Sequence, residues 1–309
     1  MSAEVESMFY VREAPWHGLG TRVEGALSSR EALIAAGLNW NVVQKEIHTK
    51  DGFPVKGYYA NVRDSDQKVL GVVTGRYQIV QNREAFAFTD GLLGKGVRYE
   101  TAGSLKEGKR TWILARLPKQ YRLLEDKIVP YLVFSNSHDG SGSIKVAMTP
   151  VRVVCQNTLN FALSNASRIW CANHTGDMER KLEDARMTLF YAENYMNELA
   201  KETAILSKRK VSDAEVEEYI KLLLPIATNA TETTERNVKK LREDLKLRYF
   251  YAPDLKHVGK NGYRFLNAVS DFATHSKPLR ETAKYKENLF LKTMEGNPLI
   301  DRAYQMMAA

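Results

Sequence analysis

Two kinds of hydrophobic periodicity divide this chain of 309 residues, and they limit its fold more than any other feature. From residue 40 to about residue 80, apolar and polar residues alternate in runs that the turn-rich segments TKDGFP and RDSDQ separate, as in an antiparallel meander. Apolar residues then recur with a helical period in long charged stretches, at 177–208, 213–224, 232–250 and 262–275. The sequence therefore predicts an α+β protein: an antiparallel β-sheet with hairpins packed on helices, followed by a mostly helical C-terminal region.

Turn and cap signals place two hairpins and two helices between these regions. VRYETAGS is predicted to pair with RTWILARLP around residues 106–109, and IVPYLVFSN with SIKVAMT around residues 138–142. Asn82 is expected to cap a helix that runs through REAFAFTDGLL. Thr149 as a cap, with Pro150 in the first turn, predicts a second helix over VRVVCQNTLNFALSNA.

The first 39 residues hold the segment PWHGLGT and a short helix, which Ser28 and Glu31 open as a capping box and Gly37 ends. A tight turn rich in glycine and aromatic residues is interpreted as a docking segment that packs on a neighbour. His17 in this turn is therefore not expected to act as an acid or a base.

The composition excludes several classes of protein. Hydrophobic residues make up 44% and charged residues 27% of the chain, as in folded domains. Two cysteines, Cys155 and Cys171, cannot build a disulfide framework, and Cys155 is expected to be a small buried apolar residue. The acidic N-terminus does not resemble a signal peptide and no stretch is long enough to span a bilayer, so a cytoplasmic protein without membrane contact is expected.

The usual catalytic motifs are missing from the sequence. It contains no phosphate-binding glycine loop, GxSxG, HExxH or paired CxxC. Cys171, His174 and Asp177 offer three metal ligands, whereas a structural site normally needs four. The sequence therefore predicts that the protein is not an enzyme and that it binds neither a metal nor a cofactor.

Positive charge is concentrated in one segment. The formal net charge is +8, and residues 101–170 hold ten Lys or Arg against four Asp or Glu, a balance of +6. Bases and aromatic residues alternate in and beside this segment, as at Arg98-Tyr99 and from Lys109 to Trp112. Because Lys and Arg neutralise phosphates and aromatic rings stack on bases, a nucleic-acid-binding surface is predicted. The alternative is that Trp112 and Tyr99 face the core while the bases solubilise an outer face.

The second hairpin extends this prediction. A basic strand that leads into a helix N-terminus would place Lys145, Arg152, Gln156 and Asn157 beside an anionic backbone. An ordinary helix cap accounts for the same residues, and the sequence leaves both interpretations open.

Four motifs carry a resemblance to a known family over nearly the full length of the chain: PWHGLGT, GVVTGRYQIVQNREAF, TPVRVVCQNTL and NAVSDFATH. The chain resembles a family of phage- and plasmid-encoded proteins of unknown function. Such a resemblance implies a bacterial host cell, but no particular activity.

The order of elements from about residue 40 to 168 is similar to that of the single-strand annealing proteins of the Rad fifty-two, Red-beta and Erf type. This resemblance implies a β-β-β-α core, a ring or helical homo-oligomer, ATP-independent annealing of complementary strands, and a phage exonuclease as partner. Carried over by position, the groove would take Lys109, Arg110, Trp112, Lys145, Arg152, Gln156 and Asn157, with Arg76 and Tyr77 as secondary candidates. The basic hairpin itself adds Arg98 and Arg116.

These observations predict a phage or plasmid recombination protein that binds and anneals single-stranded DNA, with duplex DNA or RNA as further ligands. Two other classes stay open: an interaction or anti-defence protein that docks a host protein, and a nuclease that uses Asp and Glu with a divalent metal. Three parts are expected: an N-terminal docking arm with a short helix (1–39), an α+β nucleic-acid-binding core (40–175), and a helical region for oligomer or partner contacts (176–309).

Overall fold

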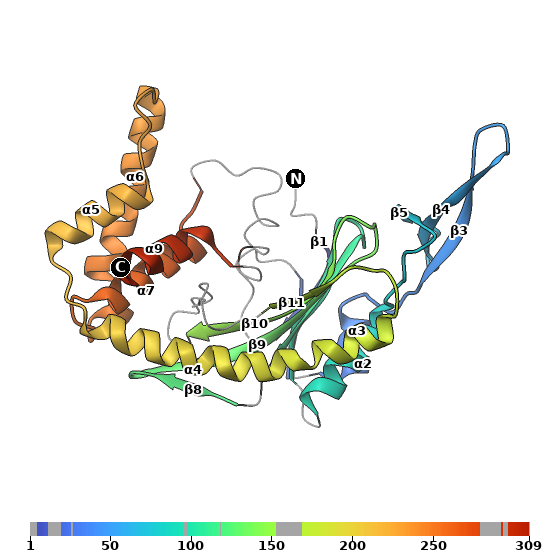
Figure 1. Ribbon diagram of the computed structural model, residues 1–309, viewed down its shortest axis with the longest axis horizontal. Helices are drawn as coiled ribbons and strands as arrows, with labels where there is room; N and C mark the ends of the chain where they lie inside the picture. Colours follow the sequence, from blue (N-terminus) through green and yellow to red (C-terminus); the bar gives the residue numbers. More distant parts are fainter. Residues whose placement is uncertain are drawn as a thin grey trace. The chain divides into compact units, whose positions relative to one another are not determined.

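The computed structural model describes residues 5–11, 20–25, 27–94, 98–117, 119–152, 169–278, 292 and 296–308. The chain divides into two compact units. The first comprises residues 1–118, 131–148 and 168–192, and the second comprises residues 119–130, 149–167 and 193–309. The fold is α+β, with mainly antiparallel sheets and a helical C-terminal region (Figure 1), as the sequence predicts.

A sheet of eight strands is the largest element (Figure 1). Its order is β11-β10-β9-β7-β6-β1-β2, with β8 paired to β9 off this path. The strands are β1 Val5–Val11, β2 Thr21–Val23, β6 Arg98–Leu105, β7 Arg110–Arg116, β8 Tyr121–Leu123, β9 Asp126–Ser137, β10 Ile144–Arg152 and β11 Ile169–Ala172. The hairpin of β6 and β7 confirms the first predicted hairpin. The segment expected as a docking arm supplies β1, an inner strand between β2 and β6.

A second sheet has three antiparallel strands in the order β3-β4-β5, which confirms the predicted meander. They are β3 Val42–His48, β4 Pro54–Arg63 and β5 Val69–Thr74. Helix α1 (Ser29–Ala35) begins at the predicted capping box of Ser28 and Glu31. Helix α2 (Asn82–Leu93) ends before Gly94, as predicted, but its N-cap is Gln81 and not Asn82. The amide side chain of Asn82 is buried inside the fold instead.

Helices follow the predicted C-terminal pattern closely. They are α3 Met178–Ala185, α4 Met187–Lys208, α5 Asp213–Leu223, α6 Glu232–Tyr251, the 3-10 turn Pro253–Leu255, α7 Gly262–His275 and α9 Pro298–Ala308. Ser212 and Glu215 form the predicted capping box of α5. The guanidinium of Arg264 is buried where α6 ends, and it donates to the carbonyl oxygens of Tyr249 and Leu255 at 2.8 and 2.9 Å. These bonds satisfy carbonyls that a helix end leaves without partners.

The prediction for residues 149–152 is wrong. Thr149 and Pro150 do not open a helix, because β10 continues through them to Arg152. The rest of the predicted helix, from residue 153 to about 165, lies outside the described residues. None of the described helices has the length and apolar character that crossing a membrane requires.

Candidate functional site

The inner face of the three-stranded sheet packs on the turn between β9 and β10. The side-chain amide of Asn61 donates to the carbonyl oxygen of His138 at 2.7 Å, and the Tyr77 hydroxyl donates to the carbonyl oxygen of Ser137. A Cβ atom on Gly71 would lie 2.5 Å from the Cα of Asp139. The two backbones can approach this closely because residue 71 is a glycine. The motif GVVTGRYQIV thus packs against the β9–β10 turn. We call the end of the large sheet that contains this turn the junction end.

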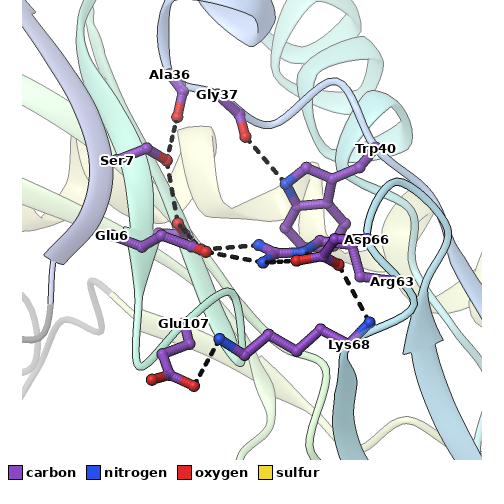
Figure 2. A network of polar contacts seen from close by, with 10 residues as sticks. Glu6, Ser7, Ala36, Gly37, Trp40, Arg63, Asp66, Lys68 and Glu107 are labelled. Carbon is purple, nitrogen blue, oxygen red and sulfur yellow. Dashed lines mark hydrogen bonds and ion pairs between the residues drawn. The ribbon is translucent and has the colours of Figure 1, made fainter.

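A cluster of ion pairs lies at the junction end (Figure 2). The guanidinium of Arg63 donates two hydrogen bonds of 2.8 Å to Glu6, and bonds of 2.9 and 2.6 Å to Asp66. It also lies over the ring of Trp40, 5.3 Å from the centroid. These bonds raise the pKa of Arg63 and lower the pKa of Asp66 to about 2. Since Arg63 is 7% exposed, this pairing keeps a buried charge compensated.

Two buried histidines belong to the same region. His138 is fully buried, and its Nε2 donates to the Asn82 side-chain oxygen at 3.1 Å. Burial lowers its pKa to about 3. His174 stacks on Tyr77 with ring centroids 4.5 Å apart, and its Nδ1 donates to the carbonyl of Gln78 at 2.9 Å. Burial lowers the pKa of His174 as well, so both rings are neutral at neutral pH.

Lys109 and Arg110, two of the predicted binding residues, lie at the junction end where β7 begins. Glu107 forms an ion pair of 2.7 Å with Lys68 (Figure 2), and this pair together with the charge of Lys109 lowers the Glu107 pKa. Burial acts to raise the pKa of Asp139, but its hydrogen bonds and the charge of Arg110 outweigh burial and lower it. Each of these two bases therefore has a carboxylate close by.

Three arginines gather at the opposite end of the β6–β7 hairpin, which we call the arginine end. Arg98 begins β6 and Arg116 ends β7, and the two are directly opposite in the antiparallel register. Arg22 of β2 joins them in the lining of a cavity of about 510 Å³. The other lining residues are Val11, Val23, Glu24, Gly25 and Glu100. Six residue steps along β7 separate Arg110 from Arg116, which puts the two ends about 20 Å apart.

The arginine end is not compensated as the junction end is. The guanidiniums of Arg22, Arg98 and Arg116 form no hydrogen bond or ion pair with any residue in the described ranges. Like charges directly opposite each other on antiparallel strands destabilise the pair by roughly 0.2–1 kcal/mol. With three arginines and two glutamates the lining has a formal balance of +1. An anion bound in the cavity would therefore reduce the repulsion between the arginines that is present in the free protein.

The aromatic residues of the predicted groove are placed differently from the expectation. Trp112 is 3% and Tyr77 is 8% exposed, so neither ring offers a face on which a base could stack. A Cβ atom on Gly103 would lie 2.7 Å from the Trp112 ring, which shows how closely the neighbouring strand covers it. Tyr99 is 1% exposed. The alternative interpretation, in which Trp112 and Tyr99 face the core, is the one the fold supports.

Among the other predicted residues, Arg76 and Lys145 do not line the arginine cavity. Arg76 is exposed just after β5, and Lys145 lies on β10 opposite Cys171 of β11. Arg152 is the last residue of β10, and its side chain lies outside the described part, as do Gln156 and Asn157. Of the predicted set, Arg98 and Arg116 are the two that the described structure brings together in a cavity.

Arg22 is a lining residue that the sequence did not indicate. It lies on a strand of three residues that pairs in parallel with β1. A strand of three residues is too short to show an alternation of apolar and polar residues. Parallel strands are not joined by a tight hairpin turn, so the sequence carries no turn signal for this pairing. The net positive charge around the pair Arg98 and Arg116 was the only sequence signal for the site.

The three residues considered for a metal do not form a site. Cys171 is exposed on β11, whereas His174 is 3% exposed and bonded to a backbone carbonyl. Within the part of the chain that the structure describes, no group of three or more His, Cys, Asp or Glu side chains is placed to hold a metal ion. His17 and Cys155 lie outside the described residues.

Comparison with known proteins gives one family. A family model described as "Domain of unknown function (DUF932)" matches residues 69–293, which is well over half of the chain. The match begins at β5 and includes the β6–β7 hairpin, the β9–β10 turn and most of the helical region. No curated protein and no solved structure matches the chain.

Proposed function

We propose that this chain, which belongs to the family of the domain of unknown function DUF932, binds the phosphates of a nucleic-acid strand at the arginine end of the large sheet. The observation that carries the proposal is the cavity lined by Arg22, Arg98 and Arg116, whose guanidiniums have no partner among the described residues. A guanidinium presents a planar fork of donors that fits two phosphate oxygens at once. Three such forks at one cavity provide a site for an anion.

Electrostatics within the hairpin supports this assignment. Arg98 and Arg116 face each other at a cost that a bound phosphate would offset. Lys109 and Arg110, on the same two-stranded hairpin, each have a carboxylate nearby. A phosphate at the junction end would compete with those carboxylates, whereas Arg98 and Arg116 form no ion pair with any described residue that a phosphate would have to displace.

Annealing of complementary strands is the finer form of this proposal. It rests on the resemblance in element order to annealing proteins and on the β3-β4-β5-α2 succession. A protein that holds a strand by its phosphates leaves the bases accessible for pairing. Annealing would then need no nucleotide cofactor, and an assay with two complementary oligonucleotides and no ATP would test it separately from binding.

Fluorescence anisotropy with a labelled single-stranded oligonucleotide tests the binding proposal. Arg98→Gln/Arg116→Gln should weaken binding at least about tenfold at low salt, because two charge-assisted contacts to phosphate are lost. Lys109→Gln/Arg110→Gln removes the same charge from the other end of the hairpin and should leave the affinity close to that of the wild type. Equal affinity for the wild type and the first double variant would refute the proposal.

Attachment to another protein is a second candidate, favoured by a different surface. Val43, Tyr58, Val69 and Val72 are between 38% and 57% exposed, and their register puts them on the outer face of the three-stranded sheet. Exposed apolar patches of this kind mark contact surfaces. In one version of this candidate, a second copy of the chain covers the face. Light scattering tests this version, because Val72→Lys should then lower the molar mass in solution. An unchanged molar mass would argue against it.

A further inference from the structure

A phosphate at the end of a strand differs chemically from one inside it. An internal phosphodiester offers two non-bridging oxygens and one negative charge. A terminal phosphomonoester offers three oxygens and about −1.5 to −2 charges at pH 7. A site built for one or the other must therefore differ in its number of donors and in how much charge it supplies.

The arginine end holds more donors than one diester can use. Arg98 and Arg116 approach the cavity from neighbouring strands and already provide two guanidinium forks. Two forks are sufficient for the two free oxygens of a diester. Arg22 brings a third from β2, on the other side of β1 from β6. This third guanidinium adds donors and one positive charge, which suit the third oxygen and the additional negative charge of a monoester.

The acidic residues of the lining point to the same distinction. Glu24 and Glu100 line the cavity with the three arginines. A strand that continued through the cavity would bring further phosphates past these carboxylates, and like charges at short range repel. A strand that ends in the cavity brings one phosphate near the two glutamates, whereas a strand that continues brings several.

The size and place of the cavity agree with a chain end. Its volume of about 510 Å³ lies within the range of roughly 300–1,000 Å³ that is usual for sites that hold one small ligand. It is lined in part by β2, the edge strand of the large sheet. A terminal nucleotide can enter from an edge without the rest of the strand crossing the sheet.

We infer that the arginine cavity recognises the terminal phosphate of a nucleic-acid strand, with Arg22 as the residue that distinguishes a phosphomonoester from an internal diester. This inference rests on the proposed function, because it assigns the ligand of the same cavity. It makes Arg98 and Arg116 responsible for affinity in general, and Arg22 responsible for the preference for an end.

The test compares labelled single strands of one sequence that differ in their ends. One pair carries a 5′-phosphate or a 5′-hydroxyl with the label at the 3′ end, and a second pair has these positions reversed. For the wild type, one phosphorylated strand should bind about tenfold more tightly than its hydroxyl form, which corresponds to one additional charge-assisted interaction. Adenosine monophosphate should displace that strand, and adenosine should not.

Arg22→Gln should abolish the preference while it leaves the affinity for the hydroxyl-ended strand close to that of the wild type. The matched control is Arg83→Gln, the same change at an exposed arginine of α2 outside the cavity, which should keep the preference. Thermal unfolding of both variants shows that each is folded.

Two results would overturn the inference, and they differ in what they say of the proposed function. If both strands of each pair bind equally and Arg98→Gln/Arg116→Gln weakens all of them, recognition of an end is wrong and phosphate binding at the arginine end stands. If no strand binds to the wild type at low salt, the inference and the proposed function both fail.

Discussion

The two ends of the β6–β7 hairpin carry the same kinds of residue and use them in opposite ways. At the junction end, Lys109 and Arg110 lie close to Glu107 and Asp139, whose pKa values they help to lower. At the arginine end, Arg98 and Arg116 face each other, and their side chains have no partner among the described residues. Pairing with carboxylates, and not the number of bases, therefore separates a structural cluster from a candidate binding site.

The first prediction concerns the junction end and has the largest expected effect. Arg63→Leu should lower the free energy of unfolding by about 2 kcal/mol, because it removes the charge-assisted hydrogen bonds of the buried guanidinium to Glu6 and Asp66. Urea denaturation measures the loss. Lys68→Leu breaks a more exposed pair and should cost less than about 1 kcal/mol. Similar losses of stability in both variants would mean that the burial of Arg63 does not increase the contribution of its ion pairs to the free energy of unfolding.

Because it contains two buried histidines, the junction end is expected to be the part of the protein that low pH destabilises. The folded-state pKa values of His138 and His174 are lowered, so protons bind preferentially to the unfolded chain. Their contribution to stability is complete above about pH 6.5 and is lost as the pH falls toward the folded-state value, which is about 3 for His138. Each proton taken up contributes about 1.4 kcal/mol per pH unit.

Urea denaturation at several pH values between about 7 and about 5 measures how steeply the stability depends on pH. His138→Asn keeps a donor for Asn82 but cannot titrate, so its stability should depend less steeply on pH than that of the wild type. An identical pH dependence in the variant and the wild type would show that His138 is not the group responsible.

Binding of a simple anion is the next test of the comparison. Inorganic phosphate at ten times its dissociation constant should stabilise the wild type by about 1.4 kcal/mol. The Lys109→Gln/Arg110→Gln variant should respond in the same way, and Arg98→Gln/Arg116→Gln should not respond. Thermal unfolding with and without phosphate, at constant ionic strength, gives the result. A response in all three proteins would place the anion somewhere other than the arginine end.

The smallest effect is expected from relief of repulsion in the free protein. Arg98→Gln removes one of two like charges in register and should raise the stability by up to about 1 kcal/mol in the absence of anions. Chemical denaturation in a buffer without phosphate or sulfate detects this change. A loss of stability would mean that the Arg98 side chain makes contacts that outweigh the repulsion.

Local signals in the sequence predicted most of the described elements. The meander over β3-β4-β5, the β6–β7 hairpin and the capping boxes at Ser28 and Ser212 depend on residues a few positions apart, and all are confirmed. The helix predicted over residues 150–152 was wrong because β10 continues through the cap signal at Thr149 to Arg152. A cap signal is local, whereas the sheet that β10 joins includes β11, which begins at Ile169.

The candidate site was less predictable than the fold. Arg98 and Arg116 belong to the predicted basic hairpin, but Trp112 and Arg110 of the same hairpin point to other surroundings. Alternation in a strand tells which residues share a face, and it does not tell which face another sheet covers. The inclusion of Arg22 depends on the parallel pairing of β1 with β2, which no local pattern encodes.

We propose that phosphates bind at the arginine end of the hairpin and not at the junction end. The dependence of single-strand affinity on salt concentration tests it most directly, because its slope counts phosphate contacts, at about 0.7 for each. Because the cavity holds one phosphate, Arg98→Gln/Arg116→Gln should reduce the slope by about 0.7 relative to the wild type, while Lys109→Gln/Arg110→Gln should leave it unchanged. A reduced slope in the second variant with an unchanged slope in the first would contradict the account.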